Sequence, residues 1–168
     1  MKKILLLVSI VLLSCSAKKN TAINTAILTS DCPKDGTCTI KLFKNQSMSI
    51  QEDEWGNRSY KLVENGEKNV IQFNYIRTVK GNLQDAGYRE EIVFEINNGS
   101  YNLSQSGAAL QNSKMLFGRF CYCKGQTGYY NVTEGNLSIS GSQQKAAMLT
   151  LKVSEVPQII KEITFTLK

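Results

Sequence analysis

The chain has 168 residues, a formal net charge of +6 and no histidine. The lack of histidine excludes Ser-His-Asp and Cys-His catalysis and the commonest zinc and copper ligand sets. From residue 25 onwards the sequence holds 16 basic and 14 acidic residues, with no run of four or more basic ones. This nearly balanced charge argues against nucleic acid as a partner.

Residues 1–14 have the pattern of a secretory signal peptide. Lys2 and Lys3 give a positive start, and residues 4–13 are apolar apart from Ser9. A helix that crosses a bilayer needs roughly 20 apolar residues, so this run is too short to be a stable transmembrane anchor. The pattern therefore predicts an exported protein from which this segment is removed.

The next feature is the sequence Leu12-Leu13-Ser14-Cys15, which resembles the lipobox of bacterial lipoproteins. The resemblance implies that the signal is cut before Cys15, that its thiol receives a diacylglycerol, and that its new amine is acylated, for example with palmitate. Several acyl chains supply the stable membrane anchoring that a single chain cannot. The alternative is an ordinary signal peptide in which the cysteine has no such role.

Residues 15–24 are expected to form the lipidated cysteine and a short tether, because residues 16–22 are small or polar. Position 16 is serine, whereas some inner-membrane lipoproteins carry aspartate there, so the resemblance implies the outer membrane. Lys18 and Lys19 replace the acidic residues typical of surface-exported lipoproteins of the Bacteroidota type. We therefore expect a lipid-anchored protein on the periplasmic face of the outer membrane.

Residues 25–168 are predicted to form a single β domain. Apolar and polar residues alternate with the period of half-buried strands in several segments, and turn-forming residues separate them. One short helical turn is expected at 108–111, and Pro157 interrupts any strand near it. The strand segments are 38–44, 58–64, 70–76, 91–96, 115–123, 136–140, 147–153 and 163–167, and the turns are 33–36, 55–57, 64–66, 97–99 and 134–136.

Segments of this size and spacing favour an antiparallel all-β fold. We expect a β-sandwich of about 8–10 strands, with one buried face on each strand. A lipocalin-like closed β-barrel is the alternative, and the sequence pattern does not separate the two.

Four cysteines remain besides Cys15: Cys32, Cys38, Cys121 and Cys123. An even number in an exported chain indicates a disulfide framework, for which three pairings exist. If Cys121 and Cys123 lie on one strand, their side chains are nearly 7 Å apart, too far for a relaxed bridge. We therefore favour cross-pairing of 32 and 38 with 121 and 123, and a local Cys32–Cys38 bridge remains the alternative.

Two other roles for these cysteines are considered. Cys121 and Cys123 could form a redox-active dithiol, with Arg119 and Lys124 nearby to stabilise a thiolate. A four-thiolate metal site is the second, but the spacings do not match familiar zinc ribbons. We expect no metal ion, no cofactor and no catalytic residue.

The segment 117–130 contains the candidate ligand-binding residues. Gly125 and Gly128 indicate a loop with an unusual backbone, and tyrosines suit the recognition of sugars or peptides. The opposing interpretation is that these aromatic residues pack against neighbouring strands. The candidates are Tyr122, Gln126, Thr127, Tyr129 and Tyr130.

The sequence also contains two acidic groups. Residues 52–54 precede Trp55 and offer carboxylates for calcium or for acid–base chemistry, although a solvated loop explains them as well. Glu90, Glu91 and Glu95 fall on both faces of their predicted strand and indicate no site.

Three functional hypotheses follow. The first is a non-enzymatic envelope lipoprotein whose β domain binds a protein, glycan or small ligand. The second is a periplasmic thiol-disulfide redox protein that uses Cys121 and Cys123. The third is a hydrolase inhibitor with a protruding loop. The chain, including its segment 121–130, resembles small envelope lipoproteins of the Bacteroidota, and this resemblance implies a location and no activity.

Overall fold

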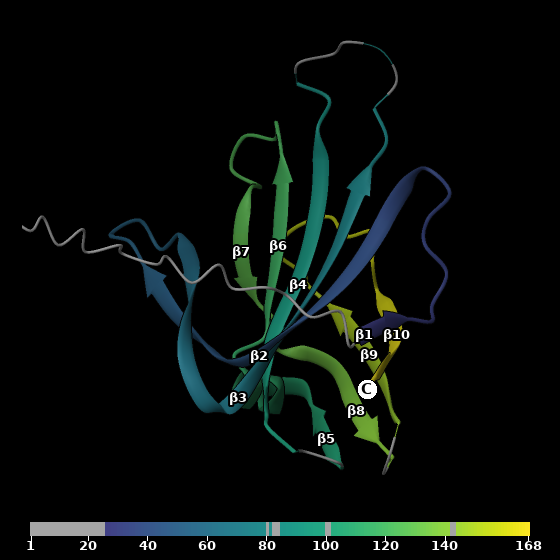
Figure 1. The fold of residues 1–168 in the computed structure, drawn as a ribbon. Helices are drawn as coiled ribbons and strands as arrows, with labels where there is room; N and C mark the ends of the chain where they lie inside the picture. Colours follow the sequence, from purple (N-terminus) through teal and green to yellow (C-terminus); the bar gives the residue numbers. More distant parts are fainter. Residues whose placement is uncertain (1–25, 80, 82–84, 100–101, 142–143) are drawn as a thin grey trace, which may run out of the picture.

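A computed structural model describes residues 26–79, 81, 85–99, 102–141 and 144–168. The signal segment, Cys15 and the tether lie outside the described residues. The described chain forms two five-stranded antiparallel sheets and one short 3-10 helix (Figure 1). The predicted mainly β fold with two sheets is confirmed.

The first sheet contains both ends of the described chain. Its strand order is β1-β10-β9-β8-β5, and all of its pairs are antiparallel. The bounds are β1 Ala26–Leu28, β5 Leu103–Ser106, β8 Glu134–Ser140, β9 Lys145–Lys152 and β10 Glu162–Leu167.

The second sheet contains the longest strands, in the order β2-β3-β4-β6-β7. One further pair, between Arg58 of β3 and Tyr129 of β7, closes β3, β4, β6 and β7 into a small barrel. Helix η1, Gly107–Ser113, connects the two sheets. The bounds are β2 Gly36–Glu52, β3 Arg58–Arg77, β4 Tyr88–Asn97, β6 Leu116–Cys121 and β7 Gly128–Asn131.

The main hydrophobic core lies between the two sheets. Phe73, Tyr75, Phe94 and Phe165 are among its largest fully buried side chains. Each buried side chain of this kind contributes roughly 1.5–3 kcal/mol to folding. The residues at 71, 73 and 75, at 92, 94 and 96, and at 163, 165 and 167 all face this core, as the alternation predicted.

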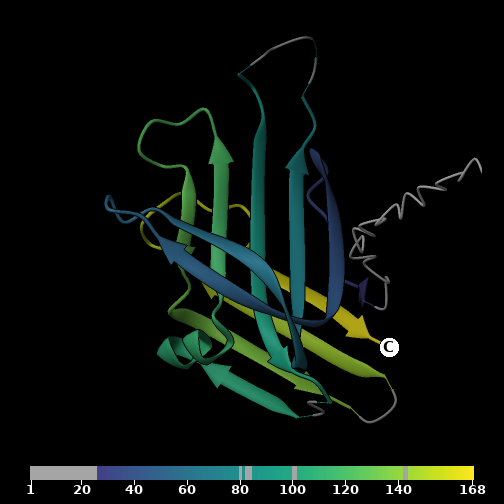
Figure 2. The same ribbon diagram turned by 60° about the vertical axis from the view of Figure 1, so that its left-hand side comes forward.

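A second, smaller core fills the barrel. It consists of Met48, Val70, Val93 and Leu116, all almost fully buried. Figure 2 shows why this core exists, because the far half of the β2–β3 hairpin crosses over the outer face of strands β4 and β6. Strands β3 and β4 are therefore covered on both faces along part of their length.

The predicted turn at 64–66 is wrong, because β3 continues through it. The register between β2 and β3 shifts here: Lys44 pairs with Asn69, and the next pair joins Gln46 to Glu64. The extra residues of β3 form an irregularity at which the hairpin bends. Turn-forming residues thus mark a bend within a strand instead of its end.

The predicted turn at 134–136 is also wrong, because these residues open β8. Gly135 has φ +133°, and a Cβ atom on it would lie 2.1 Å from the Thr150 carbonyl oxygen of β9. Glycine is needed here because the neighbouring strand approaches its backbone closely.

Glu90 of β4 joins the two sheets at one end of the main core. Its carboxylate is fully buried and accepts hydrogen bonds from the backbone N–H of Ile159 (2.7 Å) and Ile160 (2.8 Å). The Tyr88 hydroxyl donates a third, at 2.5 Å. A buried carboxylate is tolerated only with such partners, so Glu90 fixes the segment between β9 and β10 against the second sheet.

Candidate functional site

The strongest candidate site is the β6–β7 loop, residues 122–127. Strands β6 and β7 pair up to Arg119 and Gly128, and the loop projects from the end of the sheet away from η1 (Figures 1 and 2). A turn at its tip places the Gln126 N–H 3.1 Å from the Cys123 carbonyl. Gly125 supplies the positive φ of +71° within this turn.

Arg119 of β6 holds this loop in place through hydrogen bonds. Its guanidinium Nη1 donates to the Gln126 backbone carbonyl at 3.1 Å and to the Gln126 side-chain oxygen at 3.0 Å. The Thr127 hydroxyl donates to the Arg119 carbonyl at 3.1 Å. Arg119 itself is buried, so the loop rests on a fixed base.

The loop encloses one side of an open hollow of about 520 Å³. Tyr122 is 82% exposed at this hollow, and an exposed aromatic ring of this kind is available to a ligand. The lining residues are Cys121, Tyr122, Cys123, Lys124, Gly125 and Thr127.

The other sequence candidates have structural contacts of their own. The Tyr129 hydroxyl donates to Glu91 Oε1 inside the barrel at 2.9 Å. Tyr130 is half-buried and packs against the main core. Gln126 and Thr127 hold the loop through Arg119. The structure therefore brings Tyr122 and Thr127 to the hollow, but not Tyr129 or Tyr130.

The expected cross-pairing of the cysteines is wrong. Cys32 is bonded to Cys38, and Cys121 to Cys123, with Cα–Cα distances of 5.7 and 5.2 Å. Cross-pairing was expected for cysteines 121 and 123 on one strand, whereas β6 ends at Cys121 and the chain turns. The presence of two disulfides is confirmed.

The sheet order explains why cross-pairing does not occur. Cys38 lies in β2 and Cys121 in β6, with β3 and β4 between them. Three strand spacings separate them by roughly 14 Å, about twice the reach of a disulfide. In the chain-entropy model the Cys32–Cys38 bridge is worth roughly 2 kcal/mol and the shorter Cys121–Cys123 bridge about 1 kcal/mol, against about 4–5 kcal/mol for a cross-pair.

Positive side chains surround the cross-strand partner of Cys121. That partner is Tyr88, and the guanidinium carbons of Arg77 and Arg119 lie 4.6 and 5.4 Å from its ring centre. Burial and the hydrogen bond to Glu90 raise the pKa of Tyr88 to about 12. The neutral Tyr88 ring thus lies between two guanidinium groups, whose charges are accompanied by those of Asp35, paired with Arg77 at 3.3 Å, and of Glu90, bonded to the Tyr88 hydroxyl.

The acidic residues of β4 are more organised than the sequence indicated. Glu91 accepts hydrogen bonds from the Tyr60 and Tyr129 hydroxyls, at 2.7 and 2.9 Å, and pairs with Arg89 at 3.0 Å. Burial, followed by the charge of Glu91, raises the pKa of both tyrosines. No local signal reveals this cluster, because strand pairing assembles it: Tyr129 lies across Gly118 from Glu91, and the β3–β7 pair brings the Tyr60 segment to them.

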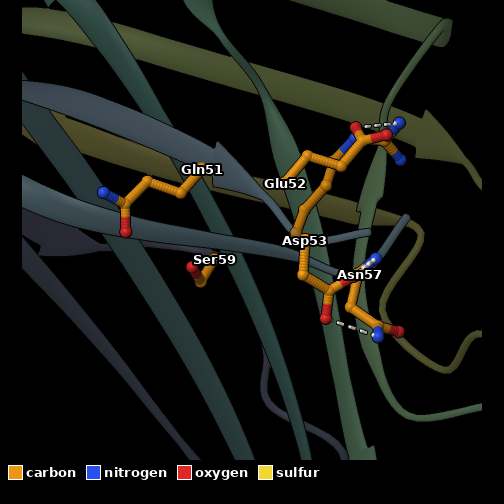
Figure 3. A pocket seen from close by; sticks show the side chains of 6 residues that line it. Gln51, Glu52, Asp53, Asn57 and Ser59 are labelled. Carbon is orange, nitrogen blue, oxygen red and sulfur yellow. Dashed lines mark hydrogen bonds and ion pairs between the residues drawn. The ribbon is translucent and has the colours of Figure 1, made fainter. Parts of the chain in front are cut away.

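A second hollow, of about 620 Å³, lies at the β2–β3 tip, residues 53–57. Asp53 accepts hydrogen bonds from the backbone N–H groups of Trp55 and Asn57 and from the Asn57 side chain, and these bonds, led by the last, lower its pKa. Figure 3 shows Asp53 directed toward Asn57, while Glu52 pairs with Arg58 at 2.8 Å.

The acidic residues 52–54 therefore do not form a ligand set at this tip. Two of the three carboxylates are already bonded to neighbours of the same hairpin. Among the described residues, no three Cys, Asp or Glu side chains are grouped so as to hold a metal ion. The Trp55 ring is 77% exposed beside them.

In the described part of the chain, no helix is long and apolar enough to cross a membrane. Comparison with protein-family models, with curated proteins and with solved structures gave no match.

Proposed function

We propose that this protein is a lipid-anchored envelope lipoprotein whose β domain binds a glycan at the β6–β7 loop. The proposal combines the lipobox-like sequence before Cys15 with one structural observation. That observation is the position of Tyr122, a residue that is 82% exposed, at an open hollow of about 520 Å³.

The chemistry of the hollow suits a sugar. A tyrosine ring offers a flat apolar face against which the C–H face of a pyranose packs. Lys124 adds a cationic group at the same hollow, and the Thr127 hydroxyl, whose proton is donated to Arg119, adds an acceptor; a few such polar groups fix the orientation of a ligand. The hollow is open, so it suits part of a longer chain better than an enclosed small molecule.

Rigidity is the second argument for binding. The loop is held by the Cys121–Cys123 bond and by three hydrogen bonds between Arg119 and residues 126 and 127. A loop that is already ordered loses little conformational entropy when a ligand binds. The same loop was expected to bind on sequence grounds, and its bracing supports that interpretation.

The test is a binding screen of envelope glycans, including peptidoglycan fragments and lipopolysaccharide core sugars, against the full-length protein in detergent. We expect Tyr122→Ala to weaken binding about tenfold or more, since an aromatic contact at a hot spot is worth about 1–3 kcal/mol. Trp55→Ala is the matched control, because it removes another exposed aromatic residue and is expected to leave binding unchanged.

Two results would overturn the assignment. One is full glycan affinity in Tyr122→Ala, provided that its thermal unfolding matches that of the original protein. The other is the failure of every glycan in the screen together with binding of a protein or peptide at Tyr122. Inhibition assays with envelope hydrolases test the inhibitor hypothesis separately, because a protein that only binds a glycan or a peptide does not inhibit them.

A further inference from the structure

We propose that the Cys121–Cys123 bond is an exchangeable disulfide, which oxidises paired thiols of exported polypeptides. This activity goes beyond glycan binding and does not depend on it, although both use the β6–β7 loop.

The first argument is the position of the two bonds. Cys32 and Cys38 pack against the main core at the start of β2. Cys121 and Cys123 line the open hollow, although all four cysteines are half-buried. A thiolate must reach a sulfur atom to attack it, and the hollow gives the second bond an open approach.

The second argument is what the bond contributes to the fold. A bridge between residues two positions apart restricts the unfolded chain very little. Arg119 and Thr127 already brace the same loop with hydrogen bonds. Opening the bond therefore leaves the strands and their pairing in place, as a reversible reaction requires.

The third argument is electrostatic. Arg119 precedes Cys121 by two positions on β6, so the two side chains leave the same face of the sheet. Lys124 follows Cys123 directly, whereas the more distant Arg77, which lies over the Tyr88 ring, is already paired with Asp35 at 3.3 Å. Positive groups near a sulfur stabilise the thiolate that leaves during exchange.

The exchange proceeds in two balanced steps. A substrate thiolate attacks the sulfur of Cys123, which forms a mixed disulfide and releases Cys121 as a thiolate. The second substrate thiol then loses its proton and attacks the substrate sulfur of the mixed disulfide, which releases Cys123. The substrate dithiol loses two electrons and two protons and becomes a disulfide, while Cys121 and Cys123 gain them as two thiols. A disulfide oxidant, such as oxidised glutathione in the assay, restores the bond by the reverse exchange.

The test uses the two bonds of one molecule as an internal comparison. The full-length oxidised protein is exposed to reduced glutathione, quenched with an alkylating reagent at intervals, and mapped by mass spectrometry. We expect Cys121–Cys123 to open about tenfold faster or more than Cys32–Cys38, as an accessible bond should. Equal rates, or earlier opening of Cys32–Cys38, would overturn the proposal.

A second measurement follows the activity itself. The oxidised protein is mixed with a reduced peptide that contains two cysteines, and formation of the peptide disulfide is monitored. We expect one peptide disulfide per protein, and recovery of the protein with oxidised glutathione. The variant Cys121→Ser/Cys123→Ser should lose this reaction while Cys32–Cys38 stays intact, and unchanged peptide oxidation in that variant would contradict the assignment.

Discussion

Several carboxylates of this fold are buried in the protein interior, and Glu95 is one of them. Glu95 is 3% exposed, yet it accepts hydrogen bonds from the Ser47 hydroxyl at 2.7 Å, the Met48 N–H at 3.0 Å and the Lys114 ammonium at 3.2 Å. Burial alone would raise the pKa of Glu95, but these partners outweigh it and hold the pKa below the usual value. The ionised form is therefore the one that the fold favours.

This environment predicts how stability depends on pH. Because the pKa of Glu95 is lower in the folded than in the unfolded chain, its contribution is complete above the unfolded value of about 4.5. The contribution is lost as the pH falls through the folded value. We expect Glu95→Gln to lower the free energy of unfolding by about 1–3 kcal/mol at pH 7. The difference from the original protein should shrink toward pH 3 in urea titrations.

Glu155→Gln is the matched control, because Glu155 is exposed. That variant is expected to unfold like the original protein at both pH values. A stability difference for Glu95→Gln that stays constant from pH 7 to pH 3 would contradict the assignment.

At the level of elements, the bend of the β2–β3 hairpin builds the barrel. Asn45 stands at the register shift with φ +55°, and its backbone N–H donates to the Asn69 side chain at 3.0 Å. The Asn98 side chain donates in turn to the Asn45 side chain at 3.2 Å. Asparagine tolerates this left-handed conformation better than most residues do, and its contacts hold the bend.

A β-branched residue at this position should weaken the bend. We expect Asn45→Val to lower the free energy of unfolding by about 1–2 kcal/mol, the cost of a left-handed backbone for such a side chain. Asn45→Gly should lose less, since glycine adopts this conformation freely. Ser49→Val, at an exposed position of the same strand, is the control in denaturant unfolding. Equal stability of the valine and glycine variants at position 45 would refute this account.

The same bend marks the limit of what the sequence predicts. Period-two alternation located most strands, because a half-buried strand has one apolar face, as at Phe73 and Tyr75. The alternation could not predict that β3 runs through 64–66, because a bulge and a turn both use asparagine and glycine. It also missed the short strands β1, β5 and β7, which have three or four residues each.

The candidate site was predicted in part for related reasons. The segment around Tyr122 was found because its glycines and aromatic residues are local features. The contact between Tyr129 and Glu91 depends on the pairing of β4, β6 and β7, which places the two residues on either side of Gly118 and is a long-range event. The prediction of cysteine pairing was wrong because the correct pairing depends on the residue at which β6 ends. Contacts between residues far apart in the sequence thus determine the features of the site that the sequence did not predict.

At the level of the whole molecule, the described fold is independent of the proposed anchor. The first sheet begins at Ala26 with a three-residue strand that pairs with β10. Ten residues separate position 15 from that strand, and such a segment spans about 33–36 Å when fully extended. If Cys15 carries the anchor, a segment of this length allows the domain to stand off the membrane surface.

This separation predicts the effect of removing the acylated thiol. In Cys15→Ser, which lacks the sulfur that the diacylglycerol requires, we expect loss of acyl labelling and release from the membrane fraction. Each acyl chain contributes about 0.8 kcal/mol per buried methylene, and stable membrane attachment needs more than one such chain. Without the diacylglycerol, we therefore expect nearly all of the protein to leave the membrane fraction. Thermal unfolding should be unchanged, because position 15 lies before the first strand.

Ser16→Ala, which keeps the cysteine, is the control and should remain acylated. If Cys15→Ser protein stays with the membranes, or if the original protein carries no acyl chain, the lipoprotein assignment fails while the fold and both proposals for the β6–β7 loop remain testable.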